Sequence, residues 1–185
     1  TLRSENYVDV AMRVISDHLR AVSFAIADGQ LPSNAKAGYV IRRILRRAVR
    51  YGYSYLDFRE PFMCKLVPVL ATQFEYVFPE LHAQVDFVTK VVEEEEKTFL
   101  RTLELGLKRL DHIFADAKTI ETKTLDGNTV FELSDTFGFP VDLTALIARE
   151  KGFAIDEEGF KSALSEQKAR SRKDATKEAA DWIEL

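Results

Sequence analysis

Apolar residues recur at steps of three and four over most of this chain, which is the spacing of one face of an α-helix. Gly, Pro, Asp and Asn stand between these segments, and such residues start or end helices. The pattern predicts helices over residues 6–27, 35–52, 62–78, 79–117, 141–151 and 157–180. Residues 130–133, which follow a turn signal at 125–128, fit either a short strand or the start of a helix.

The longest uninterrupted segment runs from Pro79 to about Ala117. Pro79 suits the first turn of a helix, where its missing amide proton costs nothing. Gly106 is the only glycine in the segment, so we expect one very long helix or two helices with a break near Gly106. Its centre, Glu93–Glu96, is expected to be a solvated acidic turn, with pairing to basic side chains elsewhere in the fold as the alternative.

Composition agrees with a helical chain. The 185 residues include 8 Gly and 5 Pro, too few for the many tight turns of an all-β fold. We therefore expect an all-α, multi-helix bundle with one very long helix and a minor β or turn element near residues 122–133. Two helical subdomains are expected, over residues 1–120 and 121–185.

Charge and composition exclude several classes of function. A net charge of −4 argues against a protein that coats long stretches of nucleic acid, so any such contact must be local. No apolar run is long enough to cross a bilayer, and the lone Cys64 is expected to be a buried hydrophobe in a reducing cytoplasm. His18, His82 and His112 do not have a metal-ligand spacing, and no phosphate loop or nucleophile motif is present. Because the chain lacks an initiator Met, we expect it to be part of a longer polypeptide.

The densest chemical signal is a group of five arginines in the second predicted helix. Arg42, Arg46 and Arg50 share one row of that helix, and Arg43, Arg47 and Arg50 share the neighbouring row. The opposite side is expected to be buried and carries the apolar residues Val40, Ile44, Leu45, Ala48 and Val49. Guanidinium groups bind phosphate through two parallel hydrogen bonds, so a phosphodiester backbone is one natural partner. The protein's own acids, such as Glu93–Glu96, are the other, and the residues alone do not decide between them.

The loop ahead of the arginine helix carries a second signal. Ser33 and Asn34 stand just before the predicted helix N-terminus, where free amides and the helix dipole favour an anion. Asn34 offers both a donor and an acceptor, which is the minimum for reading a base edge. The structural alternative is that either residue caps the helix.

Two blocks of this sequence resemble the alanyl-tRNA synthetase family. The first comprises residues 17–21 (Asp-His-Leu-Arg-Ala), 26–34 (Ile-Ala-Asp-Gly-Gln-Leu-Pro-Ser-Asn) and 38–48 (Gly-Tyr-Val-Ile-Arg-Arg-Ile-Leu-Arg-Arg-Ala). The second is residues 133–144 (Leu-Ser-Asp-Thr-Phe-Gly-Phe-Pro-Val-Asp-Leu-Thr). The glutamate run and residues 101–104 (Arg-Thr-Leu-Glu) between the blocks are also similar. The resemblance covers essentially the whole chain in the right order.

The resemblance implies a helical module that docks on the acceptor stem of tRNA(Ala) and reads a G·U wobble pair near its 3′ end. A class II catalytic domain, which activates alanine with ATP and magnesium, is expected before this segment. An editing domain with a zinc site is expected after it. The segment itself is therefore expected to hold no cofactor and no metal, and to be non-catalytic in isolation.

The resemblance implies Asn34 and Asp135 as the base-reading residues. A wobble pair leaves the guanine 2-amino group without a good partner in the shallow minor groove of RNA. A carboxylate such as Asp135 accepts from that group, and an amide such as Asn34 donates to a uracil carbonyl. The family's usual Tyr before this Asp is Ser134 here, which changes the packing around Asp135.

Contacts to the tRNA backbone are expected from the polar and basic residues around the Asn34 loop. They are Ser33, Lys36, Arg42, Arg43, Arg46, Arg47 and Arg50. Where the family commonly shows Gly-Arg-Gly-Tyr, this chain has Lys36-Ala37-Gly38-Tyr39, so Lys36 is expected to replace the missing Arg charge in part.

Two other functions compete with tRNA recognition. A helical protein–protein adaptor is the main alternative, and a DNA-binding module with the arginine helix in a major groove is another. Neither explains the second block around Asp135. We therefore expect tRNA(Ala) and the remaining domains of the same polypeptide as partners, with no DNA and no membrane.

Overall fold

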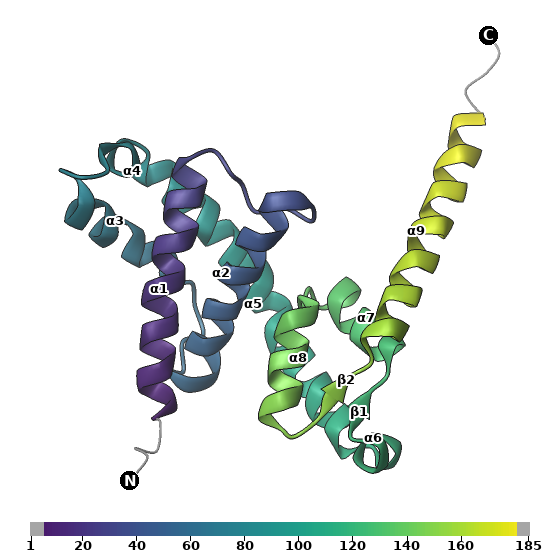
Figure 1. The fold of residues 1–185 in the computed structure, drawn as a ribbon. Coiled ribbons are helices and arrows are strands. Elements are labelled where there is room, and N and C mark those ends of the chain that lie inside the picture. Colours follow the sequence, from purple (N-terminus) through teal and green to yellow (C-terminus); the bar gives the residue numbers. More distant parts are fainter. Residues whose placement is uncertain (1–5, 181–185) are drawn as a thin grey trace. The chain divides into compact units, whose positions relative to one another are not determined.

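The computed structural model describes residues 6–180, with side chains except for those of residue 117 and residues 171–180. The described chain is mainly helical, which confirms the expected fold class (Figure 1). Its helices are α1 (Tyr7–Ala27), α2 (Lys36–Tyr55), α3 (Met63–Phe74), α4 (Pro79–Ala83), α5 (Val85–Ala115), α6 (Ala117–Thr122), α7 (Gly127–Thr136), α8 (Val141–Glu150) and α9 (Glu157–Ala180). Two short strands, β1 (Thr124–Leu125) and β2 (Ala154–Ile155), complete it. No helix among the described residues is both long and apolar enough to span a membrane.

The chain divides into two compact units, residues 1–105 (unit 1) and 106–185 (unit 2). The division falls within α5, so this helix contributes residues to both units. The subdomain boundary expected between residues 120 and 121 falls within α6. An uninterrupted helix such as α5 gives no sequence signal at the point where its packing partners change.

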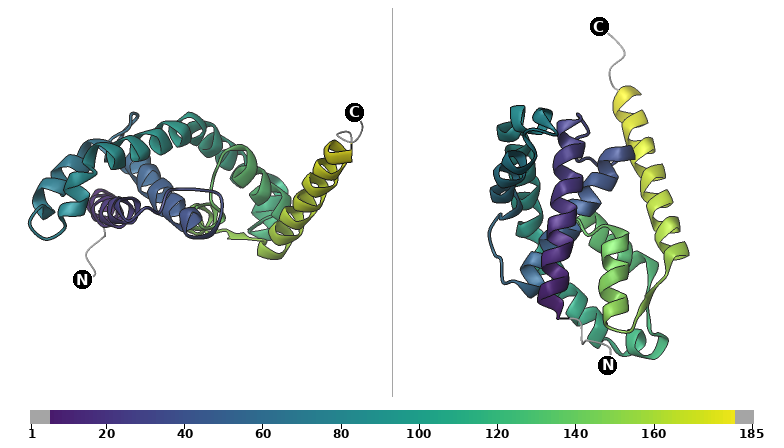
Figure 2. Two further views of the ribbon diagram at one scale, coloured as in Figure 1. Left: turned by 90° about the horizontal axis from the view of Figure 1, so that it is seen from above. Right: turned by 60° about the vertical axis from the view of Figure 1, so that its left-hand side comes forward.

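The core of unit 1 is built on α1 and α2, which lie side by side (Figure 1, Figure 2). Helix α1 buries one residue per turn along a single stripe: Ala11, Ile15, Leu19, Val22 and Ile26. Helix α2 buries Ile41, Leu45, Ala48 and Val49. The expected burial of Val40 is wrong, because 46% of its surface is exposed, and Ile44 is only half-buried. The buried stripe of α2 is centred one residue further along than we expected.

The glutamate run in α5 is only partly solvated. Glu96 is fully buried, and its carboxylate accepts hydrogen bonds from the backbone N–H groups of Phe62, Met63 and Cys64, each at 2.9 Å. The first amides of a helix have no partner within that helix, and α3 has no side-chain cap of its own. Glu96 therefore caps α3 from another helix, where the helix dipole also favours its charge.

Cys64 lies beside this buried carboxylate. Burial and the nearby Glu96 raise the pKa of the Cys64 thiol to about 11. The thiol is therefore protonated at neutral pH and acts as a packing group, as expected from the sequence.

Helix α5 continues through Gly106 without a break. A Cβ at Gly106 would overlap the ring of Phe139, so this glycine allows close packing within unit 2. The interruption after Pro79 lies instead at Gln84, between α4 and α5. Pro79 occupies the first turn of α4 as predicted, and the Gln84 side-chain amide donates to the Ala27 carbonyl at 3.0 Å.

In unit 2, β1 and β2 form a two-stranded parallel sheet with Thr124 opposite Ala154. An aspartate follows each strand directly and caps the next helix. Asp126 accepts from two amides at the start of α7, and Asp156 accepts from Gly159 N at 2.9 Å at the start of α9. Strand β1 falls in the expected region near residues 122–133, whereas its partner β2 lies outside that region. Residues 130–133 are helical within α7.

The starts of α7 and α9 touch through their glycines. A Cβ at Gly127 would overlap the backbone of Gly159 and Phe160, so these two helices meet backbone to backbone. Asp126 and Asp156 immediately precede these ends, and their caps satisfy the amides there. The later turns of α9 extend away from the other elements of unit 2 (Figure 2).

We expect replacement of Glu96 by Ala to lower the free energy of unfolding by about 3 kcal/mol, because it leaves buried amides without an acceptor. Urea unfolding of the chain measures this loss. Glu94, whose side chain is 61% exposed, provides a matched control in the same run. Its replacement by Ala should change stability by less than about 0.5 kcal/mol. Equal effects of the two variants would contradict a capping role for Glu96.

Candidate nucleic-acid interface

The loop between α1 and α2 folds back onto the first turn of α2. The Ser33 amide donates to the Gly38 carbonyl at 3.0 Å, and the Ser33 hydroxyl donates to the Ala35 carbonyl at 2.9 Å. A Cβ at Gly38 would overlap Ser33 and the Leu31 carbonyl, so the loop lies tightly against the helix. Gly38 therefore permits the close approach that seats the loop.

Neither Ser33 nor Asn34 caps α2, so that expectation is wrong. The N-cap residue is Ala35, and α2 has no side-chain cap hydrogen bond. The hydroxyl of Ser33 is engaged with the backbone of Ala35, and the side-chain oxygen of Asn34 is engaged with Arg42.

Asn34 is exposed, and its side-chain oxygen accepts a hydrogen bond from Nη1 of Arg42. The same guanidinium group donates to Glu95 in α5, from Nε to Oε2 at 3.1 Å and from Nη2 to Oε1. Arg42 and Glu95 are mostly covered, with 19% and 15% of their side-chain surfaces exposed. Arg42 therefore joins the loop to α5.

The other members of the first arginine row also face the protein. Nη2 of Arg46 lies 3.6 Å from Glu95, and its guanidinium stacks over the ring of Phe99 at 5.1 Å. Burial lowers the pKa of Arg46, and the charge of Glu95 opposes that shift. Arg50 is 5% exposed and stacks over Tyr51 and Tyr55.

Arg43 and Arg47, in the second row, are half-buried, and Arg43 stacks over Tyr39 at 5.9 Å. Lys36 is exposed at the first residue of α2. Of the two alternatives drawn from the sequence, pairing with the protein's own acids thus applies to Arg42 and Arg46, which lie against Glu95.

Asp135 lies in the last turn of α7 in unit 2 and is exposed. Its Oδ1 accepts a hydrogen bond from the side-chain amide of Gln167 in α9 at 3.1 Å. Ser134 beside it is half-buried. Asp135 is thus exposed, and a side chain of a second helix holds one of its carboxylate oxygens. In unit 1, Arg42 of α2 likewise holds the side-chain oxygen of Asn34.

Comparisons with known proteins identify the family of this chain. A family model described as tRNA synthetases class II (A) matches residues 1–184. The chain belongs to this family. The resemblance to alanyl-tRNA synthetase noted in the sequence is confirmed by curated relatives that carry the name alanine–tRNA ligase.

The similarity extends over nearly the whole chain. The alanine–tRNA ligase of Cytophaga hutchinsonii is 60% identical over 97% of this chain, and that of Flavobacterium psychrophilum is 58% identical over 98%. The relative from Parabacteroides distasonis is 54% identical over 100% of it. These alignments cover only 20 or 21% of the relatives, so the chain spans about a fifth of their length.

Glu95, which holds Asn34 through Arg42, belongs to the glutamate run that the sequence offered as a partner for the arginines, whereas Gln167, which holds Asp135 in this synthetase segment, was not predicted. Gln167 gave no signal, because nothing local distinguishes a polar residue on an exposed helix face. A signal for the glutamate run was present. Position 96 continues the buried stripe of Val88, Val92 and Phe99, so the run could not lie wholly in solvent.

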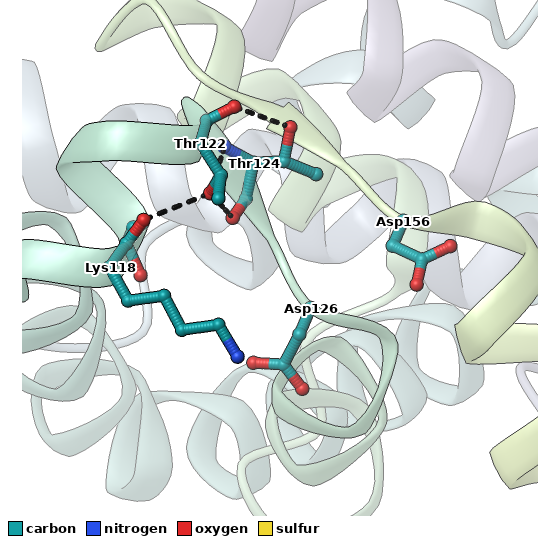
Figure 3. A pocket seen from close by; sticks show the side chains of 6 residues that line it. Lys118, Thr122, Thr124, Asp126 and Asp156 are labelled. Carbon is teal, nitrogen blue, oxygen red and sulfur yellow. Dashed lines mark hydrogen bonds between the residues drawn. The ribbon is translucent and has the colours of Figure 1, made fainter.

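Two cavities among the described residues are lined in part by charged side chains. One of about 350 Å³ adjoins the Asn34 loop and is mainly apolar, lined by Leu31, Pro32, Phe87, Lys90, Val91, Glu94 and Glu95. The other, of about 240 Å³, is lined in unit 2 by Lys118, Thr119, Thr122, Thr124, Asp126 and Asp156. The Lys118 side chain extends toward Asp126 (Figure 3), and both aspartates are already engaged as helix caps. Neither cavity includes a predicted base-reading residue.

We expect replacement of Gly38 by Ala to lower the free energy of unfolding by about 1–3 kcal/mol, because the methyl group must displace the loop backbone. Urea unfolding measures this effect. Replacement of the exposed neighbour Ala37 by Ser is the control and should cost less than about 0.5 kcal/mol. If Gly38→Ala is as stable as the parent chain, the loop does not lie against α2 in the way described.

Proposed function

We propose that this chain binds the acceptor stem of tRNA(Ala) within an alanine–tRNA ligase and reads a G·U wobble pair there. Asn34 and Asp135 are the proposed base-reading residues. The observation that most supports this is the exposed amide of Asn34, whose oxygen is bonded to Arg42. Its amino group is then the part offered to a base.

The chemistry of Asp135 complements that of Asn34. An exposed carboxylate accepts from the guanine 2-amino group that a wobble pair leaves without a good partner. The bond from Gln167 to one carboxylate oxygen restricts the rotation of the group and prepares the other oxygen for an incoming donor. A Watson–Crick pair presents these groups differently, and a polar group left unpaired in the complex costs binding energy.

Among the expected backbone-binding residues, Lys36 is exposed and Arg43 and Arg47 are half-buried, and we propose contacts to phosphate from these three. Arg42 and Arg46 lie against Glu95, and Arg50 is 5% exposed, so these three are proposed to support the helix. Ser33 keeps only a supporting role, because its hydroxyl is bonded within the loop.

The remaining steps of the ligase reaction are assigned to the rest of the polypeptide. These are alanine activation with ATP and magnesium in a class II catalytic domain, and editing in a domain with a zinc site. We expect the isolated chain to form no alanyl-adenylate, and we place the whole enzyme in the cytoplasm. A protein–protein adaptor predicts binding that is insensitive to salt and no affinity for tRNA, so the first prediction below separates the two functions.

Replacement of Arg43 and Arg47 by Ala should weaken the binding of all tRNAs alike, because phosphate contacts carry no sequence information. Each neutralised phosphate contributes roughly −0.7 to −0.9 to the log–log slope of affinity against salt, so the slope should flatten. Titration of tRNA(Ala) and a non-cognate tRNA at several salt concentrations measures both effects. Replacement of Arg59 by Ala is the control for the loss of a surface arginine. Arg59 pairs with Asp57 and stacks over Tyr53. An unchanged slope in the double variant would place the phosphate contacts elsewhere.

Replacement of Asp135 by Asn should lower kcat/KM for a G·U stem far more than for a G·C stem, by roughly 10- to 100-fold in their ratio, because a charged acceptor is lost. Asn34→Ala should act in the same direction. Neither residue caps a helix, so neither change should cost capping stability. The ratio is measured in the whole ligase, with alanine activation as the tRNA-independent control. Asp111, an exposed aspartate of unit 2, is the matched Asp→Asn control. A constant ratio in both variants would falsify the base-reading assignment.

A further inference from the structure

One guanidinium group touches both the base-reading loop and a half-buried acid of another helix. Arg42 donates to Asn34 from Nη1 and to Glu95 from Nε and Nη2. We propose that Arg42, held in place by Glu95, is a positioning residue that fixes which end of the Asn34 amide faces the tRNA. This proposal rests on the proposed function of Asn34 and adds the residues that determine its specificity.

The orientation follows from the chemistry of the two groups. A guanidinium carries only donors, so the carbonyl oxygen of the Asn34 amide must face Arg42. Turning the amide over would oppose two donors and lose a hydrogen bond. The amino group of Asn34 therefore points away from Arg42, and the residue presents a donor to its ligand.

A fixed donor distinguishes the two pyrimidines. At ring position 4, on the major-groove edge, uracil carries a carbonyl acceptor and cytosine carries an amino donor. A freely rotating amide could satisfy either base by turning over. An amide held by Arg42 donates from its amino group to the uracil carbonyl, and the same amino group opposes the cytosine amino group. Arg42 thereby converts an adaptable side chain into a selective one.

Glu95 determines where Arg42 lies. Two of the three guanidinium nitrogens face its two carboxylate oxygens, which fixes the plane of the guanidinium group and aims the third nitrogen at Asn34. Both side chains are mostly covered, which limits competition from water. A lysine at position 42 cannot reproduce this geometry, because an ammonium group is a point charge without a planar fork.

The test is a double-mutant cycle in the whole ligase, with kcat/KM measured for acceptor-stem RNAs that differ only in a G·U or G·C pair. Arg42→Lys keeps the charge and should lower the G·U/G·C ratio on the order of tenfold, the worth of one hydrogen bond. Glu95→Gln should lower the ratio in the same direction. In an Asn34→Ala background, Arg42→Lys should leave the ratio unchanged, because Arg42 acts only through Asn34.

Asn34→Asp adds a variant that retains the bond with Arg42. Aspartate still pairs with the guanidinium but presents an acceptor to the base, so the G·U/G·C ratio should fall below that of Asn34→Ala. Arg43→Ala, at the next position of the same helix, should lower kcat/KM for both stems equally. Urea unfolding of each variant identifies any that is not folded at the assay temperature. If Arg42→Lys and Glu95→Gln both unfold the protein, Asn34→Asp still tests the orientation of the Asn34 amide.

The outcomes separate this proposal from the function on which it rests. If Asn34→Ala leaves the ratio unchanged, Asn34 does not read the base and the proposed function itself fails. If Asn34→Ala lowers the ratio but Arg42→Lys and Glu95→Gln do not, the function stands and the positioning role is overturned. An Asn34→Asp ratio equal to that of the parent enzyme would also overturn it.

Discussion

Two adjacent carboxylates in the middle of α5 hold unit 1 together. Burying a carboxylate is costly unless hydrogen bonds replace its water, and Glu96 receives three of them from the start of α3. Its neighbour Glu95 points to α2 and binds Arg42 and Arg46. Neighbouring residues of a helix point about 100° apart, so this pair can engage two different elements at once. Helix α5 thereby fixes both α3 and the arginine helix.

This arrangement changes what the arginine helix does. A row of guanidinium groups repels itself, and contacts with Glu95 and with aromatic faces relieve that repulsion for Arg42, Arg46 and Arg50. The same neutralisation holds Arg42 rigid, which suits it to orient Asn34. Part of the arginine helix thus supports the Asn34 loop.

In unit 2, a different set of contacts holds Asp135, the candidate base-reading residue. Aspartates that follow each strand cap α7 and α9, and a glycine at the start of each lets the two helices meet backbone to backbone. This contact lies at the start of α7, whereas Asp135 lies in its last turn, where α9 supplies Gln167. Helix α7 is short, and it is held at its start by the Asp126 cap and near its end by Gln167 of α9. The exposed carboxylate of Asp135 therefore has little freedom to move.

The sequence by itself determined most of the helices, the place of Pro79 in a first helical turn, the family and the two candidate base-reading residues, because periodicity and local motifs are encoded within a few residues. Only the tertiary structure decided which arginines face inward, since that depends on an acid some fifty positions away in another helix. It also showed that Gly106 serves packing against Phe139 and that Ser33 and Asn34 are not caps. These outcomes depend on the partner that each side chain meets after folding, which no local pattern of residues records.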